Sequence, residues 1–182
     1  DTNPVRLDKL QQSALSSINR MMTKRTIRIG GASGFWGEAA MATPQLLAAG
    51  GLDYIVYDYL AEITMSIMAR ARARDQNRGF ATDFVDAVLK PHLADIAAQG
   101  VKLISNAGGV NPQACAVAAT QLIDDAGLDL TVAVVSGDDL MAHKAAFARR
   151  GLTEMFSDQD FPDPKDIASI NAYLGAFPIA QA

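Results

Sequence analysis

Short apolar runs alternate with longer stretches of helical periodicity along most of this chain. Four runs predict β-strands, at 26–29, 53–58, 101–105 and 130–135, and the last is apolar without a break, as is typical of a strand covered on both faces. Strands that alternate with helices pair in parallel through right-handed crossovers. The pattern therefore predicts a three-layer α/β domain with a mostly parallel sheet and helices on both faces; a partial β/α barrel is the alternative.

The helical stretches carry their own start and stop signals. Asn111 and Pro112 predict the start of one helix, because asparagine caps helix N-termini and proline is well tolerated at the first helical position. Glycines end three others, and Pro91 predicts a kink. Helices are predicted at 38–49, 61–74, 83–98, 112–126 and 140–149, with a last one from Asp166 or Ser169 to Ala182.

The first 22 residues are separate from this pattern. Leu7, Leu10, Ala14 and Ile18 recur at helical spacing, so we expect a short amphipathic helix that packs on the domain or on a neighbouring subunit. Its polar face is not strongly basic, which argues against binding at a membrane surface. Residues 1–22 are therefore expected to be an extension or leader helix, and residues 23–182 the α/β domain.

Composition narrows the classes of function. The 182 residues carry a net charge of −4, whereas a nucleic-acid partner requires a basic face. No apolar run approaches the roughly 18–20 residues of a membrane span. The single cysteine, with no glycosylation sequon and no signal-peptide core, favours the cytoplasm. His92 and His143 stand alone, so no metal site is expected.

Ligands of parallel α/β sheets bind at the carboxyl ends of the strands, where four unusual loops of this chain should meet. The first, at 30–37, carries Gly31 and Gly34 in the spacing of a dinucleotide-binding fingerprint, with Asp58 where a ribose-binding acid belongs. No Tyr-x-x-x-Lys pair occurs, and Glu38 adds a negative charge near the phosphate position. Nucleotide binding, binding of another small ligand, and a tight turn that needs small residues all stay open.

The second and third loops carry candidate catalytic groups. Asp58 and Glu62 lie four residues apart and can serve as acid and base when one is desolvated; alternatively, Asp58 caps the next helix and Glu62 completes a capping box. Asn106, Gly108 and Gly109 follow the third strand, where amide groups suit a carbonyl or oxyanion site.

The fourth loop contains Asp138 and Asp139, which suit Mg²⁺ or ribose hydroxyls unless one simply caps the next helix. Cys115, among alanines in the first turn of a helix, is expected to be buried and chemically quiet. We expect the four loops to form one concave pocket, lined by Ser33, Gly34, Asp58, Glu62, Asn106, Gly108, Asn111 and Asp138.

These segments, taken in order, resemble the N-terminal part of the acyclic terpene utilisation family, AtuA. The resemblance covers residues from about Thr23 to Ala182 and is carried by Ile27–Gly37, Leu52–Glu62, Ser105–Pro112 and Gly137–Leu140. It implies a bacterial catabolic setting, in which citronellol- or geraniol-type terpenes are broken down through CoA thioesters. Because the family's members are longer, we expect an N-terminal portion that self-associates or joins the remainder of the family protein.

The leading interpretation is a catabolic enzyme component that acts on an acyclic terpenoid acyl-CoA or acid, with lyase- or hydratase-like chemistry. In it, Asp58, Glu62 and Asn106 are catalytic, and a second set of residues holds the substrate: Gly31, Ser33, Gly34, Gly108, Gly109, Asn111 and Asp138. The alternatives are a nucleotide-dependent oxidoreductase with a glycine-rich loop and a non-catalytic ligand-binding or assembly domain.

Overall fold

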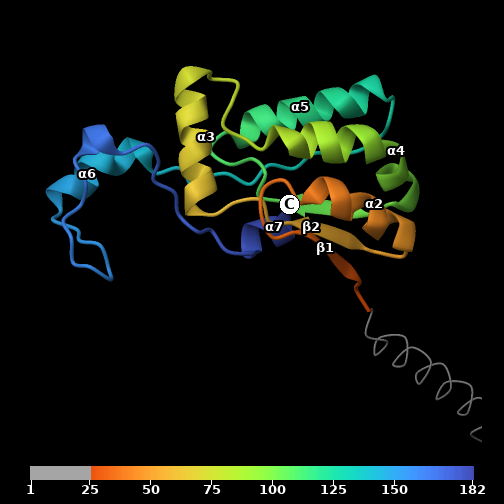
Figure 1. Cartoon of the computed structure of the whole chain (residues 1–182), viewed down its shortest axis with the longest axis horizontal. Helices are drawn as coiled ribbons and strands as arrows, with labels where there is room; N and C mark the ends of the chain where they lie inside the picture. The colour runs from red at the N-terminus through yellow and green to blue at the C-terminus, as the bar shows by residue number, and fades with distance from the viewer. Residues whose placement is uncertain (1–25) are drawn as a thin grey trace, which may run out of the picture.

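A computed structural model describes residues 26–182, so the expected helix in residues 1–22 lies outside the described part of the chain. The sheet has three parallel strands in the order β1 (Ile29–Ser33), β2 (Tyr54–Tyr57) and β3 (Lys102–Ser105). Helices pack against it (Figure 1), which confirms the predicted α/β class with a parallel sheet. Sequential order also occurs in segments of β/α barrels, so the partial barrel stays a prediction.

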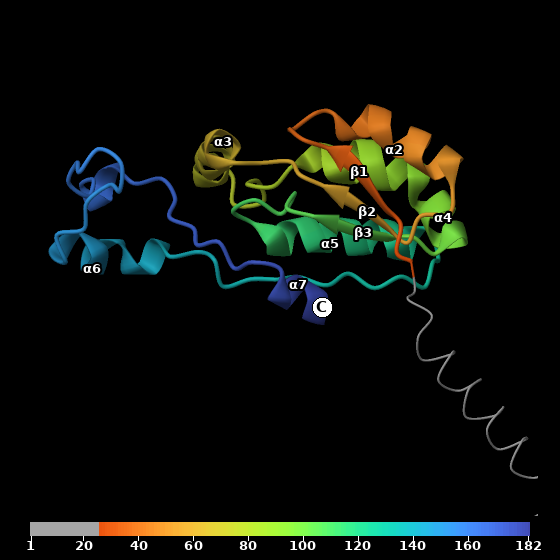
Figure 2. The same cartoon turned by 90° about the horizontal axis from the view of Figure 1, so that it is seen from below.

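Three helices lie together on one side of the sheet, namely α2 (Ala39–Ala49), α4 (Lys90–Gln99) and α5 (Pro112–Asp125) (Figures 1 and 2). Strand side chains on this side, such as Ile55 and Tyr57, are buried and form the core with the helices. The alternate positions of the strands face away from these helices. Ile29 there is 62% exposed, so an apolar side chain lies on the uncovered side.

The predicted kink at Pro91 takes the form of a π-helical turn. This turn, η1 (Phe84–Leu89), leads directly into α4, and the amide of Lys90 donates to the carbonyl of Val85 five residues earlier. Proline has no amide hydrogen, and its ring crowds the carbonyl four residues before it. A wider turn immediately before Pro91 accommodates both effects, and the chain stays helical through the predicted segment.

The first strand begins and ends later than its apolar run predicted. Gly30 and Gly31, expected in the loop, pair with Ile55 and Val56 of β2, so the loop proper starts at Gly34. A Cβ at Gly30 would lie 2.9 Å from the Leu52 side chain, which explains a small residue inside the strand. The sheet therefore tolerates glycine here because neighbouring side chains fill the space.

The predicted fourth strand, Leu130–Val135, is wrong. The segment pairs with no strand in residues 26–182, and Thr131, Ala133 and Val134 are exposed. An unbroken apolar run forms a strand only where a neighbouring strand offers its edge and both faces are covered, and the described elements do not supply that cover.

The C-terminal third is also less helical than predicted. The segment predicted at 140–149 is a short η2 (Met141–His143) followed by α6 (Lys144–Arg149). The last predicted helix shrinks to α7 (Phe177–Gln181), preceded by η3 (Pro164–Asp166). Short helices need a packed apolar face, and these elements bury none of their residues. None of the helices described has both the length and the apolar character needed to cross a bilayer.

Two tyrosines in the core differ in how their hydroxyl groups are bonded. Thr43 donates to the carbonyl of Ala39, so the Tyr57 hydroxyl donates to Thr43 Oγ1 at 3.2 Å. The Tyr59 hydroxyl is buried and has no partner among the described residues. Burial raises the pKa of both hydroxyls, so both stay protonated at neutral pH.

This contrast predicts opposite effects of removing each hydroxyl. Tyr57→Phe should lower the free energy of unfolding by about 1 kcal/mol, because it breaks a buried hydrogen bond. Tyr59→Phe should leave the stability unchanged or raise it, because a buried hydroxyl without a partner costs desolvation energy. Urea unfolding of the two variants checks this, and a larger loss for Tyr59→Phe would contradict the bonding described.

Candidate functional site

Polar groups of β1, β2 and β3 meet at the carboxyl edge of the sheet. The exposed carboxylate of Asp58 accepts a hydrogen bond from Asn106 Nδ2 at 2.8 Å, although the two residues are 48 positions apart. The amide of Asp58 donates to the carbonyl of Ser33 at 3.3 Å. The structure therefore brings together three of the residues predicted for the site, one from the end of each strand.

The side chain of Asn106 forms three hydrogen bonds within the protein, and both N–H groups of its Nδ2 are used. Its Oδ1 accepts from the amide of Tyr59 at 2.7 Å, and its Nδ2 donates to Asp58 and, at 3.3 Å, to the carbonyl of Leu60. With these bonds the amide orients the Asp58 carboxylate. A direct bond from Asn106 to a substrate carbonyl, as first expected, would require one of these bonds to break.

The alternative in which Asp58 caps the following helix is wrong. Helix α3 (Glu62–Arg74) has Ala61 at its N-cap position, and no side chain of the described residues caps it. Glu62 is exposed in the first turn, and Tyr173 donates to its Oε1 at 3.4 Å. Asp58 therefore does not cap α3, and its carboxylate is bonded to Asn106 instead.

Glycines of the first loop are not explained by packing. A Cβ at Gly31 would meet nothing within 4 Å, and one at Gly34 would meet only Glu38 Oε2 at 3.9 Å. The amide of Gly34 donates to that same Glu38 oxygen at 2.8 Å. A pyrophosphate at this loop would have to displace an internal carboxylate, which argues against the nucleotide-binding alternative.

Sequence reasoning missed Asp83, which ties the glycine-rich loop to the helical layer. Trp36 Nε1 donates to Asp83 Oδ1 at 2.5 Å, across 47 positions. Burial raises the pKa of the Asp83 carboxyl, and the Trp36 bond opposes that rise. The only sequence signal was the single tryptophan in a glycine-rich loop.

The loop after β3 is shaped mainly by packing. A Cβ at Gly108 would lie 2.8 Å from Pro112, and one at Gly109 would lie 2.7 Å from the carbonyl of Gly79. Asn111 is buried, and its Nδ2 donates to the carbonyls of Gln76 and Arg78 at 2.8 and 2.9 Å. Its side chain therefore holds the 76–79 loop and does not cap α5, contrary to the sequence expectation.

Asp138 lines a cavity of about 180 Å³ whose wall includes neither Asp58 nor Asn106. Its Oδ2 accepts from Asn171 Nδ2 at 2.9 Å. Asp139 accepts from the amide of Met141 at 2.9 Å, but Leu140 is at the N-cap position of η2 and no described side chain caps it, so the capping role considered for one of these acids is not observed here. The cavity wall is formed by Arg72, Gly109, Val110, Pro112, Gln113, Ser136, Gly137, Asp138, Asp139 and Asn171.

Metal-binding groups are sparse in the part of the chain that the structure describes. Within residues 26–182, no three His, Cys, Asp or Glu side chains are grouped so that they could hold an ion.

Cys115 is buried in α5, as predicted, and burial raises the pKa of its thiol to about 11. We expect negligible labelling by a thiol reagent at pH 8 in the native chain and rapid labelling in urea, because the thiolate is the reactive form. The raised pKa also contributes stability that is complete below pH 9.0 and is lost as the pH rises through about 11. Fast labelling of the native chain would contradict this account. The variant Cys115→Ala is the control, because it has no thiol and therefore reports the background of the reagent.

Comparison with known proteins matches the chain to a family model. No match was found among curated proteins or among solved structures. The model of the acyclic terpene utilisation family, AtuA, matches residues 27–182, which include both strand β1 and the C-terminal helix α7. The match spans the whole carboxyl edge described above, and the chain therefore belongs to the acyclic terpene utilisation family, AtuA.

Proposed function

We propose that the carboxyl edge of the sheet binds an acyclic terpenoid acyl-CoA or acid and removes a proton from the carbon next to its carbonyl group. The observation that carries this proposal is the exposed Asp58 carboxylate held by Asn106 where three strands end. Carboxylates positioned by a bonded amide are common general bases. Family membership supplies the class of compound, an acyclic terpene derivative.

In this proposal the chain's residues have distinct tasks. Asp58 accepts the proton and Asn106 positions Asp58. In a lyase- or hydratase-like elimination, Glu62 is the acid that donates a proton to the group leaving from the adjacent carbon, such as a hydroxyl that departs as water. The Ser33 hydroxyl is a buried donor without a partner among the described residues, so it can donate to a substrate carbonyl that reaches it. No cofactor is needed for this step, and the proposed compartment is the cytoplasm.

Exchange with solvent tests the first step without knowledge of the complete reaction. The chain is incubated with citronellyl-CoA in D₂O, and deuterium at the carbon next to the thioester is measured by mass spectrometry. We expect exchange well above the buffer rate, because the proton taken by Asp58 is replaced by a deuteron. Binding without exchange would instead support the alternative of a non-catalytic ligand-binding domain.

The uncovered side of the sheet also supports a proposal on partners. Ile27 and Ile29 are 53% and 62% exposed there, and apolar sheet faces are normally covered. We expect self-association of the chain, or association with another part of the family protein. Light scattering over a range of concentrations checks this, and Ile29→Lys should reduce the associated fraction. A strict monomer at high concentration would contradict it.

A further inference from the structure

Helix α3 is fixed to the protein by one face only. Met68 and Ala69 are buried, and the Arg72 guanidinium donates to the carbonyl of Val110 in the loop after β3. These contacts set the rotation of the helix about its axis. The positions on the opposite side therefore point to solvent in a defined direction.

The exposed side carries a stripe of four residues, Ile63, Ile67, Arg70 and Arg74. Their spacing of four, three and four positions places them on one face of the helix, over a length of about 16 Å. Ile63 is 78% exposed and Ile67 49% exposed, and both arginines are exposed. The stripe is thus apolar in its first half and cationic in its second.

The two arginines of the stripe have no partner among the described residues. Arg78, by contrast, lies 3.9 Å from the carboxylate of Asp75, and Arg72 is bonded to the backbone. No acidic residue occurs from Ile63 to Arg74, although the whole chain has a net charge of −4. Charge complementarity at this half of the stripe therefore favours an anion.

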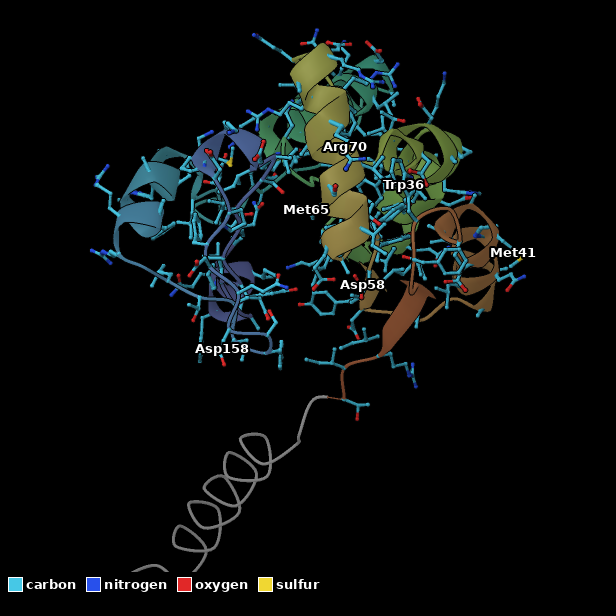
Figure 3. All side chains as sticks on the ribbon, turned by 60° about the vertical axis from the view of Figure 1, so that its left-hand side comes forward. Trp36, Met41, Asp58, Met65, Arg70 and Asp158 are labelled. Carbon is cyan, nitrogen blue, oxygen red and sulfur yellow. The ribbon has the colours of Figure 1, made fainter. Side chains whose placement is uncertain are left out.

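The stripe starts beside the proposed site. Asp58 and Glu62 lie next to the first turn of α3, and Ile63 follows Glu62 directly. Figure 3 shows Asp58 at the base of α3 and Arg70 farther along this helix. Glu38 accepts from the amide of Gly34, so that amide is already bonded, whereas Arg70 and Arg74 lie on the helix that begins beside Asp58.

We propose that Ile63, Ile67, Arg70 and Arg74 bind an amphipathic anion, with its apolar segment on the isoleucines and its phosphate group on the arginines. This inference rests on the proposed function, since it places the part of the substrate that does not react. Guanidinium groups bind phosphate through paired hydrogen bonds, and burial of the exposed isoleucine side chains makes a favourable contribution to the free energy of binding. For tight binding, the apolar segment and the anionic group must belong to the same ligand molecule.

Calorimetry with three probes tests the surface: octyl phosphate, n-octanol and inorganic phosphate. We expect octyl phosphate to bind at least 10-fold more tightly than either of the others, with an affinity that falls as salt is added. R70Q/R74Q should weaken octyl phosphate binding at least 10-fold, and I63S/I67S should also weaken it. The control pair R149Q/R150Q makes the same charge change at α6 and should leave the affinity unchanged.

Three results would overturn the inference. They are no binding of octyl phosphate, equal losses in R70Q/R74Q and the control pair, and a change of oligomeric state in the α3 variants without a change of affinity. The last would identify the stripe as a protein interface. Asp58→Asn should leave octyl phosphate binding intact, so failure of proton transfer and failure of this surface are told apart.

Discussion

Replacing Asp58 with asparagine should lower the rate of deuterium exchange into citronellyl-CoA about 10²- to 10⁴-fold, the range that a positioned general base contributes. Asparagine keeps the shape of the side chain and can still accept the bond from Asn106 Nδ2. It cannot take up a proton at neutral pH. The loss should therefore be in the exchange rate and not in the stability of the fold.

Two other variants sharpen this prediction. Asn106→Ala should lower the rate less than Asp58→Asn does, because it removes only the group that positions the carboxylate. Asp125→Asn is the matched control, since Asp125 also accepts a side-chain amide, from Gln121 at 2.8 Å, on the far helix α5. An unchanged rate in Asp58→Asn, or an equal loss in Asp125→Asn, would contradict the proposed role of Asp58.

Gly109→Ala should lower the free energy of unfolding by about 3 kcal/mol. Its φ angle of +53° disfavours any residue with a Cβ, and the added atom would meet the carbonyl of Gly79 at 2.7 Å and the sulfur of Met68. The Gly79 carbonyl cannot move freely, because it accepts from the amide of Val110 at 2.9 Å. Strain and overpacking therefore add together at this position.

Substitutions at two other glycines separate the contribution of backbone strain from that of overpacking. Gly100 has φ +64° but open space around a Cβ, so Gly100→Ala should cost about 1 kcal/mol. Gly31 has neither a positive φ nor a close neighbour, and Gly31→Ala should leave the stability nearly unchanged. Urea unfolding of the three variants gives the comparison. A loss in Gly109→Ala no larger than that in Gly100→Ala would mean that the loop moves to accept the methyl group.

Local signals were enough to predict most of the first two-thirds of the fold. β2 and β3 and the helices α2, α3 and α5 were predicted within one residue at each end, because apolar runs and capping residues mark them in the sequence. The strand predicted at 130–135 was wrong because an apolar run indicates only that the segment would be buried as a strand. It does not indicate whether a neighbouring strand is available to pair with it. Gly30 and Gly31 were predicted in a loop and lie in β1, because their pairing depends on the position of β2.

Only the part of the candidate site that follows from the parallel order of the strands was predictable from the sequence. Parallel strands place their carboxyl ends together, and this was enough to expect Asp58 and Asn106 in one region. The bonds that join Asn106 to Asp58, to the amide of Tyr59 and to the carbonyl of Leu60 depend on how two loops approach each other, and no spacing in the sequence indicates this. The bond from Trp36 to Asp83 likewise joins two segments whose approach is set by helix packing.

A crystal structure of the chain with bound citronellyl-CoA tests the central claim most directly. The account predicts that the thioester lies at the carboxyl edge of the sheet, with the carbon next to its carbonyl within reach of Asp58 and with the Asp58–Asn106 bond intact. Thioester density elsewhere, for example in the cavity beside Asp138, with Asp58 still facing solvent, would contradict it.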